Sequence, residues 1–192
     1  AYSKAETEYV TIAHQDDKYN PSYVENLMAY TKNAKKPLIF FTDYAEIRDG
    51  KMVESNKLLR IKRIMLFILR PKSMWGSRFA RRRVLSMGSP ICCPSITYYK
   101  PNLMEPVFLN GFRSNEDWEA EERISQLDGE FIFCNKILTY HRIHEDSETS
   151  KIIHDSKRSE EDYAMYRKFW PSGIARILTK LYSSSEKSNN IK

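Results

Sequence analysis

The sequence has no apolar run long enough to span a bilayer, which argues against an integral membrane protein. The first residues, Ala1 to Lys4, contain neither an initiator Met nor a signal-peptide pattern, so we expect a chain that begins partway through a longer protein. Cysteine is scarce, and Cys92, Cys93 and Cys134 are odd in number with two of them adjacent, which argues against a disulfide framework. These absences predict a reducing, cytoplasmic setting.

Acidic residues are absent from residues 56–89, a stretch rich in Lys and Arg. Apolar residues interleave with the basic ones, and Pro71 divides the stretch into two expected helices. This composition is typical of helices that lie on an anionic membrane, and it predicts such a contact through residues 57–83. Two alternatives stay open: a solvated face whose arginines pair with acids elsewhere, and a nucleic-acid surface. No known nucleic-acid-binding module is present, so nucleic acid is not an expected partner.

The rest of the chain alternates β-rich runs with helix-like segments, which predicts an α/β layered domain. Its 192 residues and 41% hydrophobic content suit one domain with a full core. The expected strands are residues 9–13, 38–42, 91–100, 131–133 and 138–143. The expected helices are residues 21–35, two within 56–89, 115–126, 160–170 and 174–181. We also expect a turn at Asp49-Gly50 and a frayed tail from Ser183.

A polar cluster directly follows the first expected strand and reads His14-Gln15-Asp16-Asp17. Adjacent carboxylates repel each other, so a fold that places them together usually supplies a cation or a hydrogen-bonding ligand. A simpler interpretation is that Asp16 and Asp17 cap the helix that opens near Pro21.

Two further polar groups occur later in the chain. Glu116 and Asp117 stand at the start of an expected acidic helix, where Asn115 is positioned to cap and the acids favour the helix N-terminus. His141 and His144 belong to a β-like segment, where their spacing places them on opposite faces, so a pair of histidine ligands is not expected. Cys92 and Cys93 are interpreted as packed small residues and not as nucleophiles.

Four pieces of the sequence, in this order, resemble the family 2 inverting glycosyltransferases of the GT-A fold. They are residues 14–17 with Pro21, the strand 38–42 ending in Asp43-Tyr44, residues 112–119, and residues 138–144. The resemblance covers residues 1–150 and implies a GT-A-like mixed sheet flanked by helices, with residues 56–89 as a basic amphipathic helical insertion. Residues 151–192 would then form C-terminal helices and a tail.

The resemblance implies transfer of a sugar, with inversion, from a nucleotide-diphosphate sugar to a glycan or lipid-linked acceptor. It places the donor diphosphate at residues 14–17, that is His14, Gln15, Asp16 and Asp17, with His144 approaching from a late loop. A divalent cation, Mg²⁺ or Mn²⁺, is then expected on Asp16, Asp17 and His144.

The resemblance also implies a catalytic base near the acceptor. An inverting transfer needs a carboxylate that takes the proton of the attacking hydroxyl. Asp117 is the first choice for this base and Glu116 the second. Trp118 either stacks on the acceptor sugar or lies in the core, and both interpretations stay open.

The sequence departs from the family pattern in two respects. His14 stands where many relatives have the first Asp of the motif, and histidine is a poorer ligand for Mg²⁺ than oxygen. The part that holds the nucleotide base in the family has no counterpart before the first strand. A degenerate, non-catalytic module that binds glycans or a membrane surface is therefore the alternative hypothesis.

Overall fold

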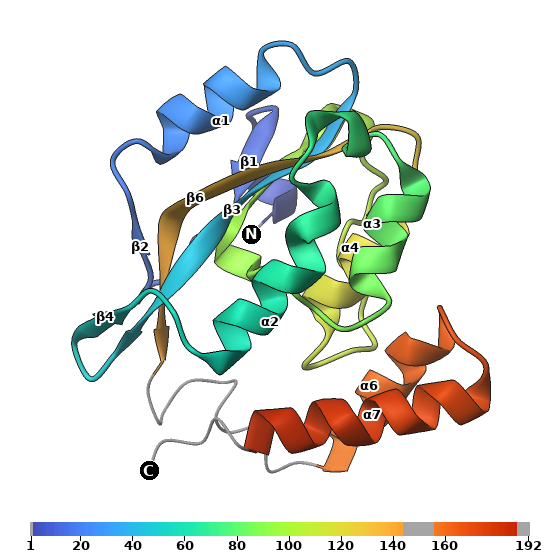
Figure 1. Ribbon diagram of the computed structural model, residues 1–192. Coiled ribbons are helices and arrows are strands. Elements are labelled where there is room, and N and C mark those ends of the chain that lie inside the picture. The colour runs from blue at the N-terminus through green and yellow to red at the C-terminus, as the bar shows by residue number, and fades with distance from the viewer. Residues whose placement is uncertain (1, 144–155, 188–192) are drawn as a thin grey trace.

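The structure, a computed structural model, describes residues 2–143 and 156–187 (Figure 1). Its centre is a curled mixed sheet in the order β1-β5-β3-β6-β2, and β4 pairs with β3. The strands are β1 Tyr9–Thr11, β2 Lys18–Tyr19, β3 Pro37–Arg48, β4 Lys51–Val53, β5 Ile96–Tyr99 and β6 Glu130–Ile143. The predicted mixed α/β class is confirmed.

The two longest strands, β3 and β6, run parallel through the middle of the sheet. The predicted strands 131–133 and 138–143 are one continuous strand, so the predicted break between them is wrong. Strand β3 also continues past Thr42, where it was expected to end. It can do so because the Asp43 carboxylate accepts hydrogen bonds from Arg63 Nε of α2, at 2.7 Å, and from the backbone N–H of Tyr44, at 2.8 Å.

The turn between β3 and β4 is the predicted Asp-Gly turn. Asp49 has φ 48° and Gly50 has φ 75°. Two positive φ values in succession are what a tight two-residue hairpin requires, and glycine adopts them without a steric penalty.

Helices cover both faces of the sheet, as Figure 1 shows. The α-helices are α1 Tyr23–Thr31, α2 Lys57–Met65, α3 Arg78–Leu85, α4 Glu116–Ser125, α6 Ser156–Arg167 and α7 Ser172–Lys187. Short 3-10 turns lie at Tyr2–Lys4, Leu66–Leu69, Lys72–Met74, Cys93–Ser95 and Lys100–Asn102. None of the helices in the described residues is long and apolar enough to cross a membrane.

Alternation along the central strands creates two separate cores. Phe40 and Ile132 point to one face, where they pack with Tyr23 and Leu27 of α1. Their neighbours point to the opposite face and join the main core under the other helices. The main-core neighbours in β3 and β6 are Ile39, Phe41, Phe131 and Phe133.

The C-terminal helices belong to this main core. Met165 and Tyr166 of α6 and Ala175 of α7 are buried in it, and the ring of Tyr166 meets Trp118 edge-on at 5.2 Å. Helix α7 continues through Lys187, beyond Ser183 where the tail was expected to begin.

The basic stretch forms two helices separated at Pro71, as predicted. Asn56 caps α2 by accepting the backbone N–H of Leu59, and Ser77 caps α3 by accepting that of Ala80. Arg81 of α3 is buried, and its guanidinium donates to backbone carbonyls that precede β6. The acceptors are the carbonyls of Ser125, Leu127 and Gly129. This arginine therefore joins the basic stretch to the segment between α4 and β6.

Candidate functional site

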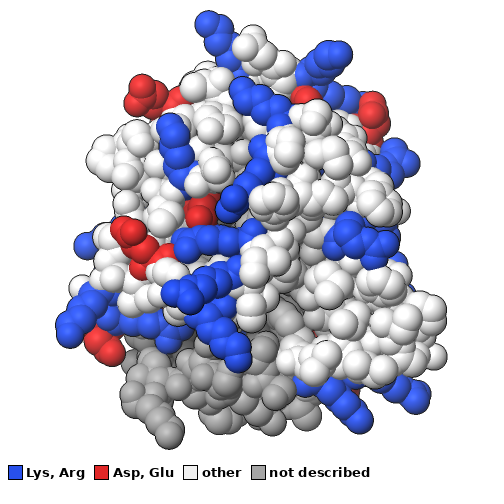
Figure 2. Space-filling view, viewed as in Figure 1, with Lys and Arg blue, Asp and Glu red and all other residues white. Residues whose placement is uncertain are grey.

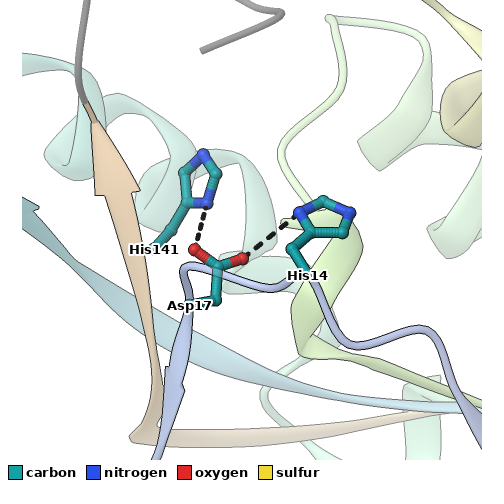
Figure 3. A group of neighbouring side chains, drawn as sticks. All are labelled: His14, Asp17 and His141. Atoms are coloured by element: carbon teal, nitrogen blue, oxygen red, sulfur yellow. Dashed lines mark hydrogen bonds and ion pairs between the residues drawn. The ribbon is translucent and has the colours of Figure 1, made fainter. Parts of the chain in front are cut away.

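Three side chains meet at the end of the sheet where β6 finishes (Figure 3). The Asp17 carboxylate is completely buried, with His141 Nδ1 2.9 Å from its Oδ1 and His14 Nδ1 3.3 Å from its Oδ2. The backbone N–H of Arg142 also donates to Oδ1, at 2.8 Å. Asp17 thus stands between two imidazoles and is held in place by the backbone of β6.

Strand pairing brings these residues together. His14 and Asp17 lie on the loop between β1 and β2, while His141 is near the end of β6. Because β2 pairs antiparallel with β6 and places Lys18 opposite Tyr140, Asp17 lies beside the last residues of β6. Arg142 reinforces the loop, since its Nε donates to the backbone carbonyl of Asp16 at 3.0 Å.

The electrostatics of this group favour an ionised Asp17. Burial alone would raise the pKa of Asp17, but hydrogen bonds from His14 and His141 outweigh burial and hold the pKa well below its usual range. The hydrogen bond to Asp17 raises the pKa of His14. Oδ2 of Asp17 is buried, and His14 Nδ1 lies 3.3 Å from it without the alignment of a strong hydrogen bond.

The same three side chains fit a metal ion. One ligand atom from each of His14, Asp17 and His141 lies within 4.8 Å of the others. Two imidazole nitrogens and one carboxylate oxygen form a ligand set typical of transition metals.

The predicted metal group was Asp16, Asp17 and His144, and the structure brings only Asp17 into this cluster. Asp16 contributes its backbone carbonyl to Arg142 instead, and His144 lies outside the described residues. His141, which the sequence did not favour as a ligand, takes part. Asp17 does not cap the first helix, because its contacts are with His14, His141 and Arg142.

A cavity of about 230 Å³ connects this cluster with the start of α4. His14 and His141 line one part of it, and Asp117 and Cys93 line another. Residues far apart in the sequence therefore line one partly open cavity. Gln15, the remaining residue of the predicted donor loop, is exposed.

Asp117 is an acid of this cavity whose pKa is raised above its ordinary value. Burial raises the pKa of Asp117, and a hydrogen bond from the Cys93 thiol and the charge of His14 oppose that rise. Burial also raises the pKa values of Cys92 and Cys93, which disfavours a thiolate nucleophile and agrees with the interpretation from sequence.

The loop that leads into α4, just before Asp117, is fixed by α6. The Glu161 carboxylate accepts the backbone N–H groups of Arg113 and Ser114 at 2.8 Å and that of Asn115 at 3.2 Å. The Asn115 side chain donates to Asp162 Oδ1 at 2.8 Å and makes no cap bond, so the predicted capping role of this side chain is wrong.

The two neighbours of Asp117 differ in their surroundings. Glu116 is exposed, and burial followed by the charge of Asp117 raises its pKa. Trp118 borders the cavity but is only 1% exposed, and its indole N–H donates to the Leu85 carbonyl at 3.0 Å. That position agrees with the core interpretation, and sugar stacking by Trp118 stays a prediction.

Lys62 of α2 also lines the cavity, although it is not among the residues that we selected from the sequence. Its ammonium lies 5.3 Å from the centre of the Tyr44 ring. Burial would lower the pKa of Lys62, but the Tyr44 and Tyr182 hydroxyls outweigh it and keep the pKa above its ordinary value. A usable signal was its spacing from Leu59 and Leu66, which places Lys62 on the inward face of the helix.

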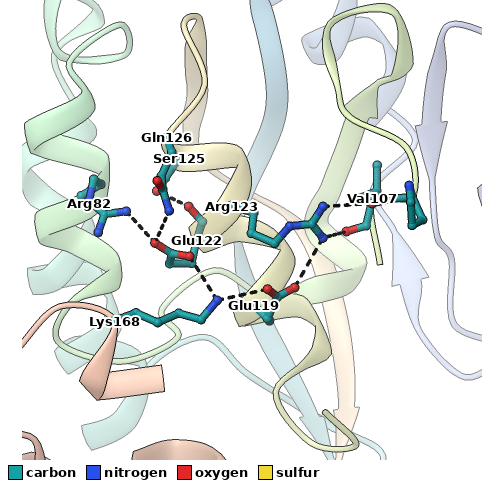
Figure 4. A network of polar contacts seen from close by, with 9 residues as sticks. Arg82, Val107, Glu119, Glu122, Arg123, Ser125, Gln126 and Lys168 are labelled. Carbon is teal, nitrogen blue, oxygen red and sulfur yellow. Dashed lines mark hydrogen bonds and ion pairs between the residues drawn. The ribbon is translucent and has the colours of Figure 1, made fainter. Parts of the chain in front are cut away.

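A network of ion pairs holds α4 from its other side (Figure 4). Glu122 accepts from Arg82 at 2.6 Å and from Lys168 at 3.3 Å. Glu119 accepts from Lys168 at 3.1 Å and faces Arg123 at 3.6 Å. These contacts join α4 to α3 and to the end of α6, which fixes the helix whose first turn carries Asp117.

No protein-family model matches the chain, and no curated protein matches it. The case for a function therefore rests on the cavity and its side chains.

Proposed function

We propose that this chain is part of an inverting GT-A glycosyltransferase of family 2. It would transfer a sugar from a nucleotide-diphosphate sugar to a glycan or lipid-linked acceptor. The observation that best supports the proposal is that Asp117 lines the same cavity as His14 and His141, which flank Asp17. The mixed sheet is compatible with a GT-A class, and the three free cysteines fit the proposed cytoplasmic location.

The diphosphate end of the donor would lie against the three-residue cluster. His14, Asp17 and His141 would hold a divalent cation, which would offset the negative charge that develops on the departing nucleotide. Imidazole ligands favour Mn²⁺ or another transition metal over Mg²⁺. Lys62, held charged in the same cavity, would add a second positive group near the diphosphate.

Asp117 would accept the proton of the attacking acceptor hydroxyl. A carboxylate becomes a stronger base when its pKa is raised, and burial raises that of Asp117. The base must be ionised to act, so the transfer rate should fall as the pH decreases through the raised pKa of Asp117. Cys93, which donates its thiol proton to this carboxylate, would orient it towards the acceptor.

The direct test is turnover with a panel of nucleotide-diphosphate sugars and Mn²⁺, measured as release of the nucleoside diphosphate. Asp117→Asn should lower the transfer rate about 10²- to 10⁴-fold, because the amide cannot take the proton. Glu116→Gln is the matched control, since Glu116 is exposed beside it, and should retain most of the rate. Full transfer by Asp117→Asn would contradict the assignment of the base. Neither turnover nor nucleotide binding with any donor would favour the non-catalytic module that binds glycans or a membrane surface.

A further inference from the structure

The structure divides the basic residues of 56–89 into an inward set and an outward set. Arg63 pairs with Asp43 at 2.7 Å, and Arg82 pairs with Glu122 at 2.6 Å. Two more are satisfied within the protein, Arg81 by backbone carbonyls and Lys62 by Tyr44. The open alternative in which arginines of this segment pair with acids elsewhere is therefore correct for part of the segment.

The outward set comprises the basic residues whose side chains are exposed to solvent. It consists of Lys57, Arg60, Arg70, Lys72, Arg78 and Arg83, all exposed. Figure 2 shows Lys and Arg side chains spread over α2 and α3, with few acidic side chains among them. The absence of Asp and Glu from residues 56–89 leaves this charge without local compensation.

Large apolar side chains project between these charges. Ile64 is 73% exposed, Phe67 65% and Phe79 66%. A surface helix normally turns such residues towards the core, but on α2 the exposed Ile61 and Ile64 share a face with Lys57 and Arg60. At a bilayer surface, exposed apolar side chains can enter the headgroup boundary while neighbouring Lys and Arg attract anionic lipids.

Helix α7 extends the apolar area. Ile174, Ile177 and Leu181 are exposed, and their spacing places them on one side of the helix. Figures 1 and 2 together show α7 on the same side of the molecule as α2 and α3, under a largely uncharged area. Gly88 lies just after α3, and a Cβ atom added there would be 3.1 Å from the Tyr182 ring of α7. The end of α3 and α7 are therefore neighbours.

We propose that the α2–α3 surface, formed by the outward basic set with Ile61, Ile64, Phe67 and Phe79, binds an anionic lipid bilayer. The charge complementarity selects an anionic partner, and the exposed aliphatic and aromatic side chains need an apolar phase, which a nucleic-acid backbone does not provide. Binding there would hold the protein at the surface of an anionic membrane. The inference is independent of the transfer reaction proposed above.

The test is sedimentation of the full chain with vesicles of phosphatidylcholine alone and with vesicles of equal parts phosphatidylcholine and phosphatidylglycerol. We expect binding only to the mixed vesicles, weakened by added salt. Each basic residue removed should lower partitioning about fivefold, so Lys57→Gln, Arg60→Gln and Arg78→Gln together should lower it about a hundredfold. Phe67→Ser with Phe79→Ser should lower it at least about tenfold, because the apolar contact is lost.

Matched controls separate this surface from net charge and from general hydrophobicity. Lys18→Gln, Lys32→Gln and Lys51→Gln remove the same charge from exposed positions elsewhere, and Val24→Ser removes an exposed apolar side chain from α1. All of these should retain vesicle binding to within about threefold. Equal losses in the control and test variants would overturn the proposal. So would duplex DNA binding without vesicle binding, or a dimer that the Phe67 and Phe79 substitutions dissociate.

Discussion

Two faces of α4 carry buried acids, and they differ in how the charges are balanced. On one face, Glu119 and Glu122 are each met by cations from neighbouring elements. On the other face, Asp117 lines the cavity, and Glu121 is fully buried with neither carboxylate oxygen hydrogen-bonded. Burial raises the pKa of both of these acids.

The difference separates a structural role from a chemical one. Acids that are paired with cations from neighbouring elements hold those elements together. Acids whose pKa is raised by burial can exchange a proton closer to neutral pH, and such groups cluster at functional sites. The face of α4 with Glu119 and Glu122 therefore holds the helix against its neighbours. On the face with Asp117 and Glu121, we assign proton transfer to Asp117.

The largest effect on stability should come from breaking the first face. Glu122→Ala removes the partner of Arg82, Lys168 and Gln126. Arg82 and Lys168 are about 30% exposed, so water compensates in part, and we expect a loss of about 2 kcal/mol in the free energy of unfolding.

Urea unfolding measures this loss, and Glu54→Ala, at an exposed position, is the control. An equal effect of the two substitutions would mean that the network does not fasten α4. The Mn²⁺ affinity should be unchanged by Glu122→Ala, because the network lies on the other face of α4.

Substitution of Glu121 should have a smaller effect on stability, and it should stabilise the protein. The raised pKa of Glu121 means that the folded protein holds this proton more tightly than the unfolded chain, so stability falls as the pH rises above the ordinary carboxyl pKa. Glu121→Gln removes that loss. The variant should melt a few degrees higher than the wild type at pH 8 and at the same temperature well below pH 4.

Thermal melts of Glu121→Gln and the wild type from below pH 4 to pH 8 test this prediction. Glu25→Gln, at an exposed position, is the control. A variant that is less stable at pH 8 would show that Glu121 is an ionised, stabilising group. The contrast between the two faces of α4 would then be wrong.

The sequence was sufficient for elements with strong local signals. The alternation of β-rich and helix-like segments predicted the α/β class, and the polar residues after β1 and at the start of α4 pointed to Asp16, Asp17 and Asp117. Strand lengths were not accessible, because the polar residues that seemed to end β3 are satisfied by partners such as Arg63, twenty residues away in the chain. For the same reason, the sequence did not show that residues 131–133 and 138–143 belong to one strand, β6.

The ligand cluster depended on tertiary contacts that no local pattern encodes. From the sequence, Asp16 was the first metal candidate and Asp17 the second, but the pairing of β2 with β6 places Asp17 beside His141. Lys62 looked like one more charge in a basic helix. Its place in the cavity follows from which face of α2 is buried, and that is fixed by packing of Leu59 and Leu66.

The central claim is that the cavity binds a nucleoside diphosphate through a metal held by His14, Asp17 and His141. Calorimetric titration of UDP and of GDP, with and without Mn²⁺, tests it most directly. The account predicts binding of at least one nucleotide that requires Mn²⁺, is weakened about 10- to 100-fold or more by Asp17→Asn and by His141→Ala, and is unchanged by the exposed Asp128→Asn. Nucleotide binding that is equal with and without Mn²⁺, or that survives Asp17→Asn, would contradict it, as would no binding of either nucleotide.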